Sequence, residues 1–157
     1  MEPAMASPIT PTIRFLAPAD EQRWRELFRA YRVFYKLEES EGVVSTAWGW
    51  LMDPTHECNA LVAEVDGEIL GFAHHRRMSS PYTATSGIFL DDLFTTPEAR
   101  GKGIGRALIG RLTDMAHAEG RAFVQWMTAE DNHTAQALYN TLATRANWIV
   151  YGAAPTA

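Results

Sequence analysis

The segment Asp92–Leu112, DLFTTPEARGKGIGRALIGRL, limits the folds open to this 157-residue chain more than any other stretch. A short β-prone run precedes three glycines at positions 101, 103 and 105, and an amphipathic helical pattern follows them. Strand, glycine turn and helix in this order predict an anion site, because glycines let backbone N–H groups point inward and the first turn of a helix leaves its N–H groups unpaired. A solvated basic turn without a ligand is the alternative when the motif is considered alone.

The spacing of these glycines excludes two familiar phosphate loops. A P-loop needs Gly-Lys followed by Ser or Thr, but Gly101-Lys102 continues with Gly103. The dinucleotide fingerprint needs a third glycine where Arg106 stands. The pattern that remains is Arg100-x-x-Gly103-x-Gly105, with positive charge from Arg100, Lys102 and Arg106.

Composition sets the class of protein. Apolar residues make up 46% of the chain and charged residues 21%, as in an ordinary globular domain. Cys58 is the single cysteine, which excludes a disulfide within the chain and a multi-cysteine zinc site. The start lacks the basic and apolar regions of a signal peptide, so we expect a disordered leader over residues 1–11, one domain over 12–157 and a cytoplasmic location. The net charge of −5 argues against nucleic acid, and no apolar run is long enough for a membrane span.

Hydrophobic periodicity predicts the elements. Strands are expected over 12–18, 60–65, 68–78, 86–96, 122–129 and 147–152, and helices over 21–36, 45–53, 104–119 and 132–143. Asp66-Gly67 is a hairpin turn signal, Asp20 an N-cap candidate, and Glu130 and Asp131 candidate caps for the last helix. The order predicts an α/β (α+β) fold with a mixed sheet and helices on both faces.

Three segments together resemble the GNAT superfamily of acyl-CoA-dependent N-acetyltransferases. Arg100-Gly-Lys-Gly103-Ile-Gly105 is similar to the family's Arg/Gln-x-x-Gly-x-Gly/Ala pyrophosphate loop, and LDDLFTTPEARGKGIG to its strand–loop–helix unit. EDNHTAQALY is similar to its Asn-x-x-Ala-x-x-x-Tyr element, here Asn132, Ala135 and Tyr139. QWMTAEDNHTAQALY and AYRVFY look closest to the small-amine and polyamine branch. The chain departs from the pattern at Thr144-Arg145-Ala146, where many relatives have a glycine-bearing turn.

The resemblance implies a single-domain GNAT fold, with a mixed, mostly antiparallel twisted sheet whose central strands splay apart. It implies acetyl-CoA as co-substrate and a homodimer. The pyrophosphate would be held by the loop residues Arg100, Gly101, Lys102, Gly103, Ile104, Gly105 and Arg106. The pantetheine arm would bind backbone groups near Leu93, Phe94 and Thr95 and the side chain of Asn132.

The implied chemistry needs a base and an acid. An alkyl amine is neutral in only about one molecule per 2,500 at pH 7, so a general base is useful. Asp91 matches an acidic position of polyamine-type relatives and is our candidate base. Tyr139 falls where the family's thiolate-protonating tyrosine lies; an ordinary buried helix tyrosine is the alternative. Because Cys58 lies away from the motif, we expect direct transfer in a ternary complex.

Substrate-binding candidates surround the two acids. Adjacent strand residues face opposite ways, so Asp91 and Asp92 are expected on opposite faces, as are His74 and His75. Asp92 is expected to bind a substrate ammonium or to cap a loop, and His74 to line the pocket and shuttle a proton or to be purely structural. Tyr31, Tyr35 and Trp126 complete the candidate wall. The scattered histidines predict no metal site.

The leading interpretation is therefore an N-acetyltransferase acting on a small cationic primary amine. The alternatives are a protein or peptide N-acetyltransferase and a non-catalytic acyl-CoA-binding regulatory module.

Overall fold

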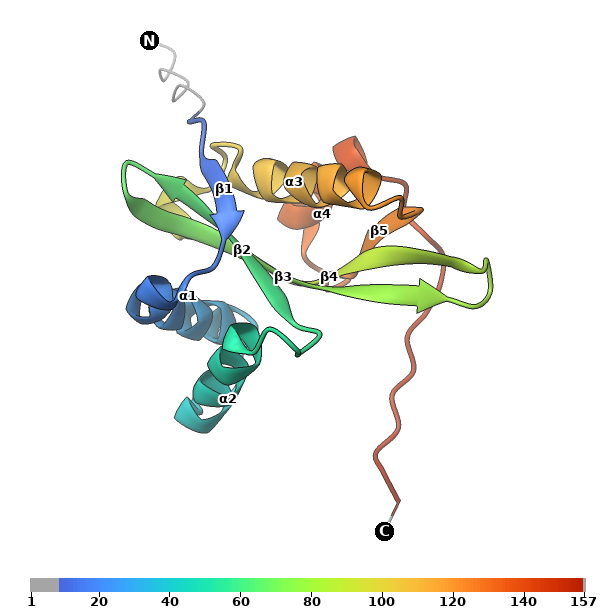
Figure 1. The fold of residues 1–157 in the computed structure, drawn as a ribbon, viewed down its shortest axis with the longest axis horizontal. Helices are drawn as coiled ribbons and strands as arrows, with labels where there is room; N and C mark the ends of the chain where they lie inside the picture. The colour runs from blue at the N-terminus through green and yellow to red at the C-terminus, as the bar shows by residue number, and fades with distance from the viewer. Residues whose placement is uncertain (1–8, 157) are drawn as a thin grey trace. The chain divides into compact units, whose positions relative to one another are not determined.

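Five strands form one mixed sheet in the structure, a computed structural model that describes residues 9–156 (Figure 1). They lie side by side in chain order: β1 (Thr12–Phe15), β2 (Asn59–Val65), β3 (Glu68–Ser80), β4 (Thr85–Thr95) and β5 (Phe123–Trp126). The first four pair antiparallel, and β5 pairs parallel with β4. Helix α3 (Ile104–Ala118) supplies the crossover that a parallel pair requires. The predicted mixed, mostly antiparallel sheet is confirmed.

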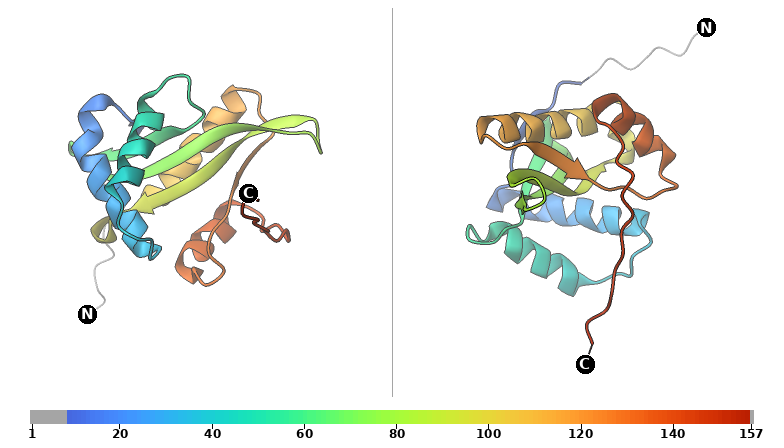
Figure 2. Two further views of the ribbon diagram at one scale, coloured as in Figure 1. Left: turned by 90° about the horizontal axis from the view of Figure 1, so that it is seen from below. Right: turned by 90° about the vertical axis from the view of Figure 1, so that its right-hand side faces the viewer.

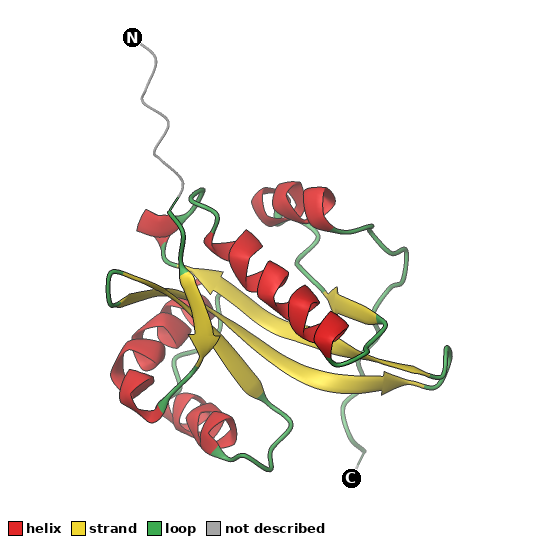
Figure 3. Cartoon of the chain, turned by 45° about the horizontal axis from the view of Figure 1, so that its top comes forward, coloured by secondary structure: helices red, strands yellow, loops and turns green. Residues whose placement is uncertain are grey.

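Helices cover both faces of this sheet. Helices α1 (Glu21–Phe34) and α2 (Glu41–Met52) lie on one face and α3 on the other, as Figures 1, 2 and 3 show from different sides. One-turn 3₁₀ helices, Pro18–Asp20 and Pro97–Ala99, precede α1 and the glycine loop.

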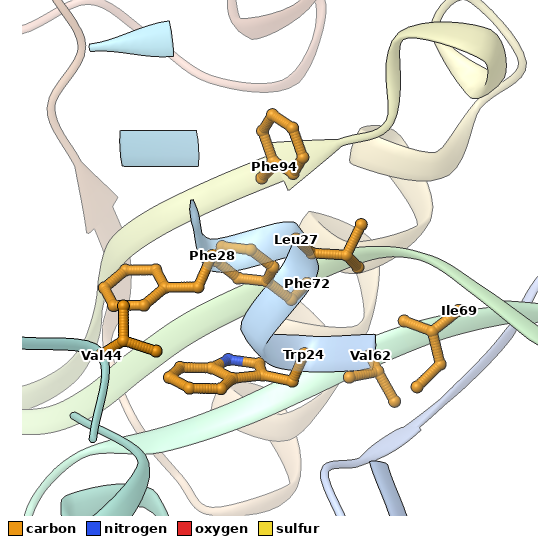
Figure 4. Close-up of a cluster of buried hydrophobic side chains, with 8 residues drawn as sticks. All are labelled: Trp24, Leu27, Phe28, Val44, Val62, Ile69, Phe72 and Phe94. Atoms are coloured by element: carbon orange, nitrogen blue, oxygen red, sulfur yellow. The ribbon is translucent and has the colours of Figure 1, made fainter. Parts of the chain in front are cut away.

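The core between α1, α2 and the sheet follows from the helical spacing of apolar residues. Trp24, Leu27 and Phe28, at i, i+3 and i+4 on α1, are buried against the sheet (Figure 4). The same cluster contains Val44 from α2 and Val62, Ile69, Phe72 and Phe94 from the strands. Burying each of these large side chains contributes about 1.5–3 kcal/mol. This packing fixes α1 against β3 and α2 against α1 and β2.

Local turn chemistry explains most element boundaries. Asp66 and Gly67 have φ of 51° and 79°, which confirms the predicted hairpin turn between β2 and β3. Helix α2 begins earlier than predicted, because the Ser40 hydroxyl accepts from the N–H of Val43. Asp20 does not cap α1 through its side chain; its carboxylate accepts hydrogen bonds from Arg14 and from the Ala17 N–H instead.

The chain divides after Met127, and the residues from Thr128 onward form a second compact unit. Its helix α4 (His133–Leu142) is capped by the Asn132 side chain, which accepts from the Ala135 N–H, so Glu130 and Asp131 were wrong candidates. The strand predicted over residues 147–152 is wrong, because no strand forms in these described residues. A β-prone apolar run becomes a strand only when another strand supplies hydrogen-bond partners.

Two predictions lie partly outside what the structure describes. The leader expected over residues 1–11 falls mostly on residues 1–8, which are not described. The single domain over 12–157 stays a prediction.

In residues 9–156, no helix is long and apolar enough to cross a membrane.

Candidate functional site

The parallel pair β4–β5 opens part-way along β4. Its ladder runs from the Gly87–Phe123 pair to the Leu90–Trp126 pair, whereas β4 continues to Thr95 paired with β3 alone. The backbone of Asp91–Thr95 therefore lies beyond the parallel ladder. This stretch includes Leu93, Phe94 and Thr95, whose backbone groups were expected to bind the pantetheine arm. One of these groups is already occupied, because the Arg100 Nε donates to the Thr95 carbonyl at 3.2 Å.

The glycine loop follows directly on β4 and the 3₁₀ turn. Gly101 and Gly103 have φ of 75° and 89°, a left-handed backbone conformation that residues other than glycine rarely adopt. A Cβ added at either position would meet no protein atom within 4 Å, so the space beside the loop is open. Gly103 is the N-cap of α3 and brings no capping side chain to the first-turn N–H groups. An anion can take the place of that cap.

The side chains of the loop differ in their burial and in their contacts. Ile104 is 1% exposed and anchors the start of α3 in the core, so only its backbone is available to a ligand. The guanidinium of Arg100 lies 5.2 Å from the ring centre of Phe34 and 5.7 Å from that of Phe94. Arg100 thereby ties the loop to α1 and β4. Arg106 is exposed, and Lys102 is half-buried.

A cavity of about 740 Å³ lies on the α1–α2 side of the sheet. Its acidic wall comes from Asp91 and Asp92 on β4, beside His74 and Arg76 on β3. The remaining wall is mostly apolar, from Phe28 on α1, from α2 and from Cys58 before β2. Its volume suits a small molecule. The predicted wall residues Tyr31, Tyr35 and Trp126 are not among the residues that line it.

A β-bulge in β4 brings the two carboxylates into this one cavity. His74 pairs with Asp92 and His75 with Leu90, so Asp91 is an extra residue in β4. The bulge interrupts the alternation of side chains, and both acids line the same cavity. The prediction that they lie on opposite faces is therefore wrong.

Asp92 is held by hydrogen bonds from Tyr31 and His74. The Tyr31 hydroxyl donates to Asp92 Oδ1 at 2.7 Å, and His74 Nδ1 lies 2.8 Å from Oδ2. Burial alone would raise the pKa of Asp92, but the hydrogen bond and the charge attraction of His74, together with the hydrogen bond from Tyr31, outweigh it and lower that pKa. His74 also accepts from the indole N–H of Trp24 at 2.9 Å. Because both ring nitrogens are engaged, the geometry favours the structural alternative for His74 over a proton shuttle.

Asp91 has a different environment. The Nε of Arg76 donates to both of its oxygens, at 3.1 and 3.2 Å, and the guanidinium lies 5.0 Å from the ring centre of Phe89. Burial raises the pKa of Asp91 and outweighs the opposing effect of Arg76. Arg76 was not among the predicted site residues, although its period-two spacing from His74 places it on the same face.

Comparison with known proteins identifies the family. The model of the Acetyltransferase (GNAT) family matches residues 22–143. The chain belongs to the GNAT acetyltransferase family. It is 31% identical over 141 residues to the D-amino-acid N-acetyltransferase HPA3 of Saccharomyces cerevisiae, covering 88% of each chain. It is 30% identical over 129 residues to the thialysine N-epsilon-acetyltransferase of Sus scrofa, covering 77% of this chain and 74% of the other.

A solved structure agrees with the fold. The ribosomal-protein-alanine N-acetyltransferase from Brucella melitensis biovar Abortus 2308 is 25% identical, with a TM-score of 0.78 over 93% of this chain and 99% of the other. The GNAT fold and acetyltransferase activity predicted from the three similar segments together are thereby confirmed. GNAT acetyltransferases use acetyl-CoA, and the open glycine cradle at Gly101 and Gly103 fits its pyrophosphate.

Two of the predicted site residues belong to the second unit. Asn132 caps α4, and Tyr139 is half-buried on that helix, seven residues further along. Their roles toward acetyl-CoA stay predictions. Among the residues that the structure describes, no three His, Cys, Asp or Glu side chains form a group that could hold a metal ion.

Proposed function

We propose that this GNAT acetyltransferase transfers the acetyl group of acetyl-CoA to the primary amine of a small cationic substrate, by direct transfer in a ternary complex. The observation that carries the proposal is the pair Asp91 and Asp92 in one cavity of about 740 Å³, beside the point where β4 leaves β5. Acetyl-CoA supplies an acetyl thioester when bound. The chain's own residues bind the two substrates and move the protons.

The donor side of the site is largely backbone. The N–H groups of the loop 100–106 and of the first turn of α3 would hold the pyrophosphate. The backbone near Leu93 and Phe94, beyond the parallel ladder, would hold the pantetheine arm as an added strand does. Asn132 would contribute a side-chain hydrogen bond.

On the acceptor side, the two carboxylates have separate tasks. Asp92, with its lowered pKa, stays ionised and binds the ammonium of the substrate. Asp91, with its raised pKa, takes a proton from that ammonium, directly or through a water, and so generates the nucleophilic amine. Tyr139 would donate a proton to the departing thiolate.

The names of two relatives support a small acceptor. The HPA3 relative is named for D-amino acids and the Sus scrofa relative for thialysine, and both share most of their length with this chain. The cavity is also of a size that suits such a molecule. The solved structure named for a ribosomal protein makes a protein acceptor the second candidate.

A homodimer is part of the proposal. Trp148, Ile149, Val150 and Tyr151 are between 74% and 86% exposed, an unusual density of apolar side chains. A second copy of the chain would cover them.

The test is a thiol-release assay on the purified protein with acetyl-CoA and a panel of amines. The panel contains D- and L-amino acids, diamines, polyamines and peptides with free N-termini, and mass spectrometry identifies the product. We expect acetylation of small amines, with initial-rate lines that intersect and no acetylated protein when acetyl-CoA is present alone. Activity on peptides only would replace the small amine by a protein acceptor, and binding of CoA without any thiol release would indicate a regulatory module.

A further inference from the structure

A chain of hydrogen bonds runs from the core to the wall of the cavity. The indole Nε1–H of Trp24 donates to His74 Nε2 at 2.9 Å, and His74 Nδ1 lies 2.8 Å from Asp92 Oδ2. Trp24 is fully buried and His74 is 7% exposed. His74 and Asp92 both line the cavity, and Asp92 forms part of its acidic wall.

The chemistry of indole fixes the tautomer of His74. An indole nitrogen can only donate a hydrogen bond, so His74 Nε2 must present its lone pair to Trp24. The single ring proton then lies on Nδ1 and is donated to Asp92. A second proton, on Nε2, would point at the N–H of Trp24. The arrangement therefore places the ring proton on Nδ1, facing Asp92.

Aromatic packing holds the imidazole in this orientation. The ring of His74 stacks on Phe72 at 4.4 Å between ring centres and meets the edge of Phe28 at 5.4 Å. Phe28 and Phe72 belong to the buried cluster that also contains Trp24 (Figure 4). Rotation of the ring would break both of its hydrogen bonds within a well-packed core.

The two carboxylates of the cavity differ as a result. Asp91 is paired with the cation Arg76, whereas Asp92 accepts hydrogen bonds from His74 and Tyr31. We propose that Trp24 and His74 are positioning residues, which hold the carboxylate of Asp92 in place for the ammonium of the acceptor. The proposal rests on the proposed function in taking an amine as the ligand.

Several other titratable groups surround His74. They are Asp91 and Asp92 on β4, His75 and Arg76 on β3, Tyr31 on α1, and Glu57 and Cys58 in the cavity wall. Of these, Asp92 is the one hydrogen-bonded to the imidazole.

The first test needs no activity. Long-range ¹H–¹⁵N spectra of the wild-type protein report the tautomer of each histidine, and the His74 signals are those lost in His74→Asn. We expect the ring proton on Nδ1 and a lone pair on Nε2. A proton on Nε2 overturns the inference. This result stands even if no amine is acetylated.

The Trp24→Phe variant separates the indole N–H from ring packing. Without the donor, the ring proton is no longer confined to Nδ1, and His74 with its proton on Nε2 no longer donates to Asp92. The KM for the best amine of the panel should then rise about 10-fold relative to the wild type, with similar kcat. An unchanged His74 tautomer and an unchanged KM in the folded variant overturn the role of Trp24.

Substitution of His74 by Asn and by Leu tests the His74–Asp92 end of the hydrogen-bond chain. The same two variants also provide the test if Trp24→Phe does not fold. Asn keeps an N–H donor near the position of Nδ1, whereas Leu keeps only apolar volume. We expect KM for the amine to be at least fivefold higher in His74→Leu than in His74→Asn, with similar kcat and similar affinity for CoA. Equal KM values in two folded variants would show that His74 does not act through Asp92.

Discussion

Gly103 offers the most direct test of the donor site. It has φ of 89°, and a Cβ placed there would meet no protein atom within 4 Å. Alanine at this position therefore causes no clash within the protein, and its cost is the left-handed backbone alone, about 1–2 kcal/mol. For a chain of this length, that corresponds to a fall in Tm of about 2–8 °C.

Gly67 is a matched control in the hairpin between β2 and β3. Its φ is 79°, and its Cβ would also meet no protein atom within 4 Å. Gly67→Ala and Gly103→Ala should therefore lose similar stability. Only Gly103→Ala places a methyl group beside the N–H groups proposed for the pyrophosphate. Losing one charge-assisted hydrogen bond there costs about 1.5–3 kcal/mol, or about 10- to 150-fold in Kd.

Isothermal titration with CoA, together with thermal melts, measures both quantities on the same samples. We expect Gly67→Ala to bind CoA as the wild type does and Gly103→Ala to bind it at least 10-fold more weakly. If the two variants are equally destabilised and bind CoA equally well, the loop does not hold the cofactor, and the reasoning from its open cradle fails.

Three further outcomes are expected. Tyr139→Phe keeps the ring but removes the proton donor, so kcat should fall about 100-fold with unchanged CoA affinity; near-normal turnover would leave Tyr139 a packing residue. The deficit of Asp91→Asn in kcat/KM should shrink as pH rises toward the pKa of the amine, because solvent then supplies the neutral nucleophile; an equal deficit at every pH would limit Asp91 to positioning. Burial lowers the pKa of His75 to about 4, so its contribution to stability is complete above the ordinary imidazole value of about 6.5 and is lost as pH falls toward 4. Urea melts should show a loss of about 3 kcal/mol across that window, and in His75→Leu this loss should be absent.

The sequence predicted correctly those turns and helices that depend on residues close together in the chain. The Asp66-Gly67 turn, the amphipathic α1 and the glycine start of α3 each depend on residues close together in the chain. The expected strand over 147–152 failed for the opposite reason. Its apolar, β-branched residues suit a strand, but a ladder partner is a property of distant residues that no local pattern contains.

The acceptor site shows the same limit more sharply. An alternating pattern predicts opposite faces for Asp91 and Asp92, and the single extra residue of the bulge reverses that conclusion without leaving a mark in the apolar periodicity. The bulge places two adjacent acids against different neighbours, Arg76 in one case and His74 with Tyr31 in the other. Their pKa values move in opposite directions, upward for Asp91 and downward for Asp92. A carboxylate with a raised pKa is the better proton acceptor near neutral pH, and one with a lowered pKa is the more constant charge. The division of tasks proposed for the pair follows from one inserted residue in β4.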